Sequence, residues 1–337
     1  MSDDAPQLPP LDHGRALALF DAVGAVHVVV VGDVMLDHFM VGRVSRVSPE
    51  APVPVLEFDR EFSVPGGAAN VAHNAAALGA RVTLVGLVGD DAAAADLRGL
   101  IEGRGISARG LVVDPTRPTT RKTRLATTRN QQVARVDVER AVDADDRLGD
   151  ALARVVEEAA ADAAAIIVSD YLKGVVTPAV MARVVAAAHG RGVPLLVDPK
   201  VPHVDRYAGA TLLTPNHHEA EAATGLTIRE MADVRRAARQ LTGQARVGGV
   251  LVTWGEQGMW LSHGVVEGHL PAAAREVADV TGAGDTVVAV CGALMAAGAT
   301  SAEAARLANQ AAGVVVTRFG ASAVTADELR QRLGTSG

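Results

Sequence analysis

Residues 279–286 (DVTGAGDT) combine the residue types and the spacing that phosphoryl transfer needs. They precede residues 287–298, an apolar run without charge or proline that predicts a buried helix. The first amides of a helix lack internal partners and lie at the positive end of its dipole. Because Gly282 and Gly284 carry no side chain, we expect that an anion can approach these amides closely.

Asp285 falls in the first turn of this predicted helix, directed at the same point as the amides. A carboxylate there can take the proton of an attacking hydroxyl while the amides hold the charge on the moving phosphoryl group. A glycine turn followed by a helix, with Asp285 as an ordinary carboxylate of its first turn and no catalytic role, would have the same sequence. The stretch alone therefore leaves both interpretations open.

The composition sets limits on the rest of the chain. It has 337 residues, 49% of them hydrophobic, and a formal net charge of −7, which argues against bulk nucleic-acid binding. The single cysteine, Cys291, excludes a disulfide framework and a cysteine-rich zinc site. No signal-peptide pattern and no uninterrupted apolar run of about 18 residues occurs, so we expect a cytoplasmic protein without membrane association.

Several other phosphate-binding motifs are absent from the sequence. There is no Gly-Lys pair, which excludes a Walker A loop, and neither HRD nor DFG occurs, which excludes a protein kinase. Val287 stands where a dinucleotide fingerprint would have its third glycine. A nicotinamide-dependent dehydrogenase is therefore a weak alternative.

The order of elements predicts an α/β fold. Residues 26–32 form a β-branched run typical of a central strand, and from residue 145 onward strands and helices alternate. Such alternation predicts a mostly parallel sheet with helices on both faces. Polar residues follow four of the strands, and we expect them to share one sheet edge: Asp33, Asp170 with Lys173, Asp198 with Lys200, and Asn216 with Glu219.

Two segments do not fit this core, about residues 38–62 and 109–140. They alternate polar and apolar residues and contain prolines typical of edge strands, so we expect a small β-sheet, inserted as a lid. Between them Gly66 and Gly67 open an alanine-rich helix, with Asn70 one turn in. The arginine-rich stretch 116–135 is a candidate phosphate-binding face, although a solvated face explains most of its charges.

Three motifs now stand in order along the chain: GGAAN at 66–70, PNHHE at 215–219 and DVTGAGD at 279–285. They resemble the two signatures and the N-x-x-E motif of the ribokinase/PfkB-type carbohydrate kinases. This resemblance implies a ribokinase-like α/β domain over residues 1–337 with a β lid, and Mg²⁺-dependent phosphorylation of a sugar by ATP.

Three further stretches resemble one subgroup, the D-glycero-β-D-manno-heptose-7-phosphate kinases: GDVMLD at 32–37, the stretch 43–55, and QQVARVD at 131–137. Membership would imply phosphorylation at C1, giving the 1,7-bisphosphate for ADP-heptose and lipopolysaccharide synthesis. Because the chain ends at Gly337, we expect the kinase alone and a separate nucleotidyltransferase. A kinase for another sugar phosphate, such as fructose 6-phosphate, and a non-catalytic sugar-binding regulator are the alternatives.

The resemblance also implies roles for individual residues. Asp285 would be the base, and the anion hole would comprise the amides of Gly282, Ala283 and Gly284. The substrate would contact Asp33, Gly66, Gly67, Asn70 and Asp198, while Lys173 and Arg135 are candidates for its phosphate from their charge and position. ATP would lie against Asn216, Glu219, Gly255, Gly258 and Asn309, with Glu219 placing Mg²⁺ through water. The exposed edge of the lid would pair two copies of the chain into a homodimer.

Overall fold

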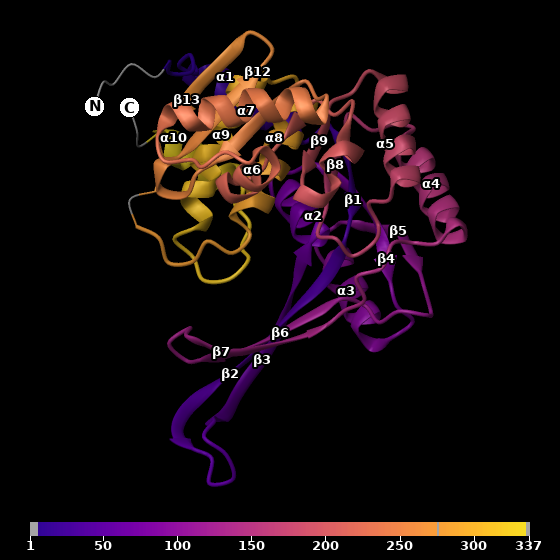
Figure 1. The fold of residues 1–337 in the computed structure, drawn as a ribbon, viewed down its shortest axis with the longest axis vertical. Helices are drawn as coiled ribbons and strands as arrows, with labels where there is room; N and C mark the ends of the chain where they lie inside the picture. Colours follow the sequence, from indigo (N-terminus) through magenta and orange to yellow (C-terminus); the bar gives the residue numbers. More distant parts are fainter. Residues whose placement is uncertain (1–5, 275, 335–337) are drawn as a thin grey trace.

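The computed structural model describes residues 6–274 and 276–334 and contains one large sheet of nine strands (Figure 1). In order across it lie β13 (Val266–Leu270), β12 (Met259–His263), β11 (Gly249–Thr253), β10 (Leu212–Leu213), β9 (Leu195–Asp198), β8 (Ala165–Ser169), β1 (His27–Gly32), β4 (Arg81–Val88) and β5 (Ser107–Val113). The strands from β11 to β5 are parallel to one another, while β12 pairs antiparallel with both β11 and β13. The predicted mostly parallel sheet is confirmed.

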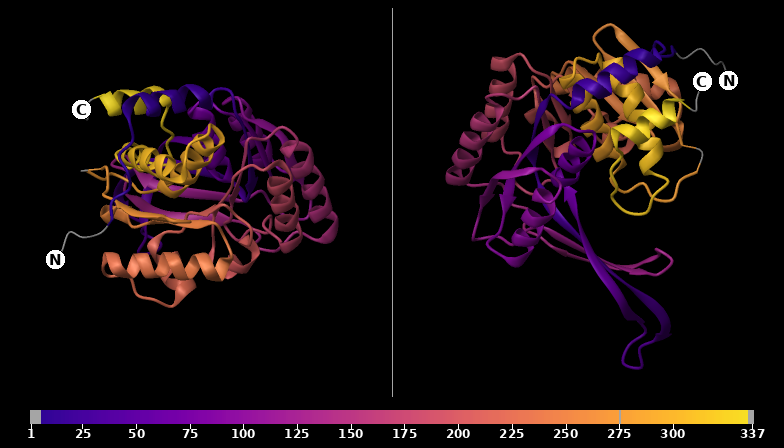
Figure 2. Two further views of the ribbon diagram at one scale, coloured as in Figure 1. Left: turned by 90° about the horizontal axis from the view of Figure 1, so that it is seen from above. Right: turned by 180° about the vertical axis from the view of Figure 1, so that it is seen from behind.

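Helices cover both faces of this sheet and enclose two apolar cores (Figure 2). One face carries α1 (His13–Val23), α2 (Ala68–Ala77), α3 (Ala92–Glu102), α8 (Ala283–Ala296), α9 (Ser301–Val315) and α10 (Ala326–Gly334). The other carries α4 (Asp146–Ala160), α5 (Pro178–Arg191), α6 (His217–Thr224) and α7 (Met231–Ala245). Helix α8 is buried along nearly its whole length, as its charge-free sequence predicts. No helix in the described part of the chain is long and apolar enough to cross a membrane.

A second sheet of four strands projects from the main body as the lid (Figure 1). Its order is β3 (Pro54–Gly67), β2 (Val34–Val47), β6 (Arg121–Thr127) and β7 (Gln132–Val138). The expected start of its second segment, residue 109, is wrong. Residues 107–113 pair with β4 instead and form the edge strand of the large sheet.

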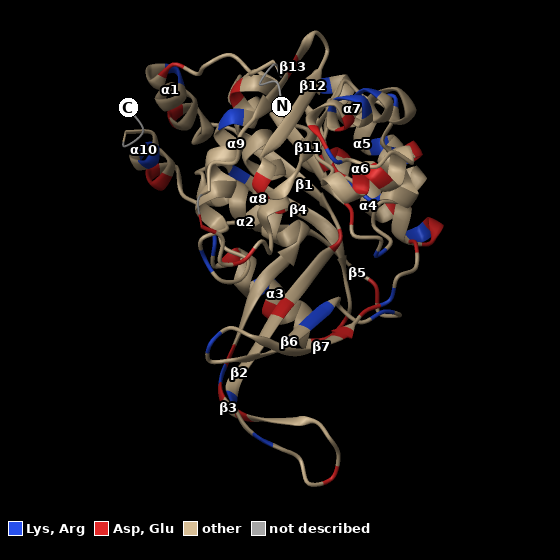
Figure 3. Ribbon diagram, turned by 60° about the vertical axis from the view of Figure 1, so that its left-hand side comes forward, with Lys and Arg blue, Asp and Glu red and all other residues tan. Residues whose placement is uncertain are grey.

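The lid surface mixes charge with exposed apolar side chains. Acidic and basic residues both lie along the lid (Figure 3), and cross-strand ion pairs join Lys122 to Asp137 and Glu139. Phe58 and Val47 are 62% and 63% exposed. Since β3 and β7 are both edge strands, the lid offers unpaired backbone as well as apolar surface.

Strand register brings the candidate residues to one edge of the large sheet. Gly32 at the end of β1 pairs with Ser169 at the end of β8, and Ser169 in turn pairs with Asp198 on β9. The loops that begin at Asp33 and Asp170 therefore meet. Parallel strands place their carboxyl ends together, which is why side chains far apart in sequence converge here.

Candidate active site

Asp285 lies in the first turn of α8 and is only 5% exposed. Its carboxylate is held between two donors: the Asn70 side-chain amide reaches Oδ2 at 2.7 Å, and the Tyr171 hydroxyl reaches Oδ1 at 2.8 Å. Burial raises the pKa of Asp285 from 3.8 to about 6, although both hydrogen bonds oppose that rise. A carboxylate with a pKa close to neutral suits the role of general base.

Asn70 is itself fixed by a chain of hydrogen bonds between α2 and α8. The Asn74 side-chain amide donates to the Asn70 backbone carbonyl at 2.9 Å. The Thr286 hydroxyl, one residue after the base, donates to Asn74 Oδ1 at 2.9 Å. Because all three polar side chains are buried, this network holds the base and its donor in one geometry.

Gly282 precedes α8 in a left-handed conformation with φ 78°, and no side chain caps the helix. A Cβ atom at this position would lie 2.8 Å from Asn70 Nδ2, so only glycine fits beside the residue that holds the base. Around Gly284, by contrast, no atom lies within 4 Å of an added Cβ. The space beside Gly284 is therefore open, and the approach of an anion to its amide stays a prediction.

The amide of Ala283 is used differently from the prediction. It donates to the Val280 carbonyl at 3.2 Å within the turn that leads into α8. An amide that already donates cannot also hold a phosphoryl oxygen at full strength, so Ala283 contributes to the turn rather than to an anion hole. Asp279 secures the same turn by accepting from Thr281 and from the Gly320 amide at 2.9 Å.

The expectation that Asp33 grips a sugar is not supported by its contacts. Asp33 is 1% exposed, and its oxygens accept from the amides of Tyr171, Lys173 and Val175 at 2.8–3.0 Å. Burial raises the pKa of Asp33 despite these hydrogen bonds. Asp33 therefore fixes the loop after β8 and leaves no oxygen directed at a ligand.

Asp37 on β2 occupies the place expected of Asp33. Its charge raises the pKa of Asp285, so the two carboxylates face each other across the site. Asp37 forms an ion pair with Arg124 at 2.7 Å. A Cβ atom at Gly66 would lie 2.8 Å from Asp37 Oδ2, which explains the first glycine of the predicted pair. The second, Gly67, has φ 56° and passes so close to the Asp33 carbonyl that a Cβ would lie 2.5 Å away.

Lys200 stands at the centre of an acidic cluster after β9. Its ammonium contacts Glu219 and lies 5.3 Å from the centre of the Tyr171 ring. Burial raises the pKa of Asp198 to about 8, against the lowering effect of Lys200, with Asp285 and Glu219 adding to the rise. Lys200 therefore contacts Glu219 directly, and the charges of Asp198 and Asp285 lie near enough to act on it.

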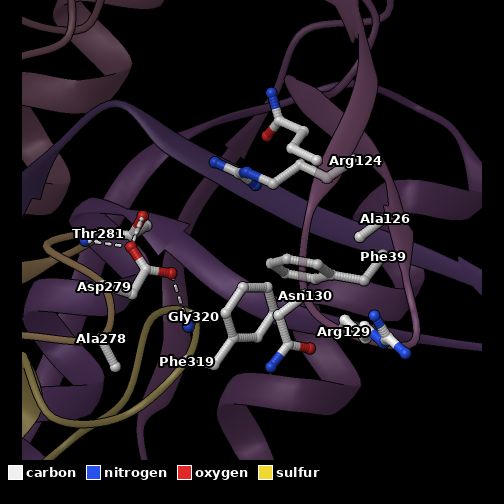
Figure 4. Close-up of a pocket in the computed structure, with 11 residues that line it drawn as sticks. Phe39, Arg124, Ala126, Arg129, Asn130, Ala278, Asp279, Thr281, Phe319 and Gly320 are labelled. Atoms are coloured by element: carbon white, nitrogen blue, oxygen red, sulfur yellow. Dashed lines mark hydrogen bonds between the residues drawn. The ribbon is translucent and has the colours of Figure 1, made fainter.

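A pocket of about 480 Å³ opens between the lid and the loops on either side of α8 and α9 (Figure 4). Arg124 and Arg129 border it from the lid, and Thr281 and Asp279 border it from the turn before α8. Phe39 and Phe319 meet edge to face in the same pocket at 6.2 Å between ring centres. A ligand under the lid would therefore lie close to the amides of that turn.

Comparison with known proteins identifies the group to which this geometry belongs. Residues 26–328 match the family described as "pfkB family carbohydrate kinase". The chain belongs to this family. It is also similar to two proteins named "Bifunctional protein HldE": one from Geobacter sulfurreducens, 46% identical over 94% of this chain, and one from Azorhizobium caulinodans, 50% identical over 91%. The chain spans only 65% and 64% of the length of those relatives.

Solved structures of pfkB kinases and ribokinases share the fold of this chain. An Arabidopsis thaliana ribokinase complexed with ribose and ATP has a TM-score of 0.71 at 21% identity, covering 91% of this chain and 98% of the ribokinase. Escherichia coli phosphofructokinase-2 with substrates and products has a TM-score of 0.76 at 19% identity, covering 92% and 99%. At these identities the likeness shows the ribokinase-like fold alone.

The N-x-x-E motif of this pfkB protein forms a capping box. Asn216 accepts the Glu219 amide, and Glu219 accepts the Asn216 amide, both at 2.9 Å, so the pair begins α6. One Glu219 oxygen is thereby committed to the cap, and the other faces Lys200. The motif thus has a structural task that is compatible with placing a cation.

The other residues predicted to bind ATP do not contact the base. Gly255 has φ 52° and open space around it, whereas a Cβ at Gly258 would lie 2.0 Å from the Leu270 carbonyl. Packing therefore explains Gly258 without a nucleotide. The Asn309 amide donates to the Pro271 carbonyl at 2.7 Å. Roles toward ATP for these three residues remain predictions.

The two cations proposed for the substrate phosphate are already paired in the lid region. Arg135 binds Asp137 through two hydrogen bonds of 2.8 and 3.0 Å and is 47% exposed. Lys173 pairs with Glu139 at 2.7 Å, but its backbone amide donates to Asp33 in the loop whose Tyr171 contacts the base. Lys173 is therefore the better placed of the two.

Sequence reasoning did not assign roles to Asp37, Tyr171 or Lys200, although all three surround Asp285. Asp37 and Lys200 carried a signal, since each stands in a polar group directly after a predicted strand. Tyr171 carried almost none, because a tyrosine in a loop is common and its contact with Asp285 spans 114 positions of sequence.

Proposed function

We propose that the chain transfers the γ-phosphoryl group of ATP to the C1 hydroxyl of D-glycero-β-D-manno-heptose 7-phosphate, giving the 1,7-bisphosphate and ADP. The observation that carries this proposal is the buried base Asp285 at the start of α8, opposite Asp37 and the glycine pair of the sugar-kinase signature. Likeness to the HldE relatives over almost the whole chain supports the choice of a heptose phosphate.

The reaction follows from the geometry of the base. Asp285 accepts the proton of the C1 hydroxyl as that oxygen bonds to the γ-phosphorus, and the bond from this phosphorus to the β–γ bridging oxygen breaks. The amide of Gly284, in the first turn of α8 at the positive end of the helix dipole, stabilises the charge on the transferred oxygens. Asp37 and Asn70 orient the sugar beside the base.

The acidic cluster around Lys200 has the donor chemistry that Mg²⁺ requires. Mg²⁺ prefers carboxylate oxygens and water, and the Glu219 oxygen that now faces Lys200 can face a second cation. Among the described residues no three metal-ligating side chains converge, which fits an ion held mainly by ATP and water. When bound, Mg²⁺ would neutralise phosphate charge.

We also propose that two copies associate through the lid. The exposed Phe58 and Val47 and the free edges of β3 and β7 support this arrangement. Sedimentation of the wild-type chain and of a Phe58→Ser variant tests it, since the variant is expected to shift toward the monomer.

ADP release with Mg-ATP across a panel of sugars tests the proposed reaction. The panel contains heptose 7-phosphate in the manno form, unphosphorylated heptose, fructose 6-phosphate and ribose. Turnover confined to heptose 7-phosphate is the expected result. Turnover on fructose 6-phosphate or ribose would replace the proposed substrate, and sugar binding without any ADP release would point to the regulator.

A further inference from the structure

Tyr171 is the second anchor of the base, and its position is set by the loop after β8. Its hydroxyl donates to Asp285 Oδ1 at 2.8 Å, while Asn70 donates to the other oxygen. The two donors come from different elements, one from the loop at residue 171 and one from α2. The carboxylate therefore cannot rotate without breaking one hydrogen bond.

The loop that carries Tyr171 is unusually constrained. Asp33 accepts the amides of residues 171, 173 and 175, so a single buried carboxylate fixes five residues of chain. Leu172 adopts φ 58°, a left-handed conformation that leucine rarely takes and that persists only when its surroundings impose it. Gly174 packs so tightly that a Cβ would lie 2.0 Å from the Val142 carbonyl.

Asp170 gives the loop a further set of anchors. His203 Nδ1 lies 2.6 Å from Asp170 Oδ2, and the Tyr207 hydroxyl donates to the same oxygen at 2.7 Å. The Leu172 amide donates to the other Asp170 oxygen at 2.8 Å. Backbone strain, close packing and two buried carboxylates therefore act together to fix the position of the Tyr171 hydroxyl.

We propose that Tyr171 is a positioning residue for phosphoryl transfer: its hydroxyl, held by the Asp33-anchored loop, fixes the Asp285 carboxylate toward the acceptor and stabilises its charged form. This inference rests on the proposed function only in taking Asp285 as the base. The inference also gives Asp33 a role. Asp33 does not contact the sugar, but it holds the loop that positions Tyr171 against Asp285.

The other charged groups that face Asp285 come from three further elements. Asp37 on β2 and Asp198 on β9 favour its protonated form, whereas Lys200 after β9 favours its ionised form. None of these groups is hydrogen-bonded to Tyr171 through its side chain. Removing the Tyr171 hydroxyl therefore changes one stabilising contact of the base and leaves the surrounding charges in place.

The first experiment compares kcat against pH for the wild type and Tyr171→Phe, using the sugar that the wild type turns over. Phenylalanine keeps the ring beside Lys200 and removes only the hydroxyl. Losing a hydrogen bond to a buried charge should move the acid midpoint upward by about one to two pH units. The KM for the sugar should change much less than kcat at pH 6. An unchanged midpoint would overturn the proposal.

The second tyrosine provides a matched control. Tyr207→Phe removes a buried hydroxyl that donates to a carboxylate, but that carboxylate is Asp170 and not the base. The acid midpoint of this variant should move much less than that of Tyr171→Phe. An upward shift equal to that of Tyr171→Phe would mean that loosening the loop, and not the contact with Asp285, moves the pKa.

A third variant shifts the midpoint the other way without removing any contact of Asp285. The chain has only two tyrosines, so in Tyr207→Phe all incorporated 3-fluorotyrosine is at position 171. The fluorinated phenol is a stronger donor and should move the acid midpoint downward. This keeps the proposal testable if Tyr171→Phe fails to fold, because a midpoint that stays constant or rises would contradict it.

An infrared difference titration with ¹³C-labelled aspartate needs no substrate. Subtracting the spectra of Asp285→Asn isolates the carboxyl band of Asp285, whose midpoint should rise in Tyr171→Phe. If no sugar is turned over but this band shifts, the proposed function fails while the role of Tyr171 stands. If turnover occurs and the band does not shift, the proposed function stands while the role of Tyr171 fails.

Discussion

Replacing Asp285 by asparagine should stop the reaction and make the protein more stable. Burial raises the pKa of this carboxyl from 3.8 to about 6. At about 1.4 kcal/mol per pKa unit, ionised Asp285 lowers the free energy of unfolding by about 3 kcal/mol at neutral pH. Asparagine carries no charge and can accept from Asn70 while donating to the Tyr171 hydroxyl, so both neighbours keep a partner.

The sign of the pH dependence separates this effect from a general change in packing. A carboxyl whose folded pKa lies above its unfolded value lowers the free energy of unfolding as the pH rises from the unfolded pKa to the folded pKa, because only the unfolded chain loses the proton in that range. The advantage of Asp285→Asn should therefore be small at pH 4, grow between about pH 4 and 6, and stay at about 3 kcal/mol from above pH 6 to pH 8. Urea unfolding of both proteins at pH 5 and pH 8 measures the difference.

The neighbouring turn offers a control of opposite sign. At Asp279 burial raises the pKa, but hydrogen bonds from Thr281 and Gly320 outweigh it and the net shift is downward. Asp279→Asn should therefore be less stable than the wild type at pH 8, with the gap closing as the pH falls.

Turnover of Asp285→Asn should drop by about 10²–10⁴-fold. Near-normal kcat, or a stability gain equal at both pH values, would refute the reasoning.

Three shorter predictions concern the remaining parts of the site. Gly282→Ala forces a side chain into Asn70 from a left-handed backbone, so kcat should fall by at least about tenfold. Gly284→Ala meets no atom beyond its own helix and should chiefly raise the KM for ATP. Equal effects of the two substitutions on kcat would contradict this account. The wild-type kcat should rise with pH through about 6, because the ionised form of Asp285 is the active one; a profile flat from pH 5 to 8 would remove it as the base. Glu219→Gln should increase the Mg²⁺ concentration needed for half-maximal activity several-fold, and an unchanged requirement would place the ion elsewhere.

The main sheet could be predicted because local signals were strong there. The run of valines in β1 and the charge-free sequence of α8 each leave one reasonable interpretation, and the structure confirms both. The lid start was wrong at residue 109 because β5 carries the same mixed pattern as a lid strand. Only its pairing with β4, which sequence does not show, assigns it to the large sheet.

Within the site, sequence identified the types of residue better than their partners. Asp285 and Asn70 stand in recognisable motifs, and they do meet. Asp33 and Asp37 were four positions apart in one motif, and nothing local decides which of them faces the base. The decision lies in three amides from a loop 138–142 residues away, which occupy Asp33 and leave Asp37 to the site.

The hairpin of β2 and β3 in the lid begins and ends at the candidate active site. Strand β2 starts directly after Asp33 and carries Asp37, while β3 ends at Gly67, where α2 and Asn70 begin. The two strands, each of 14 residues, therefore join the distal tip of the lid to the residues proposed to contact the sugar. A displacement of the distal tip, for example on contact with a second copy, would therefore move Asp37 and Gly66 and change the affinity for the sugar. Mutations far out on the lid could thus retune which sugar is accepted while the machinery around α8 stays untouched.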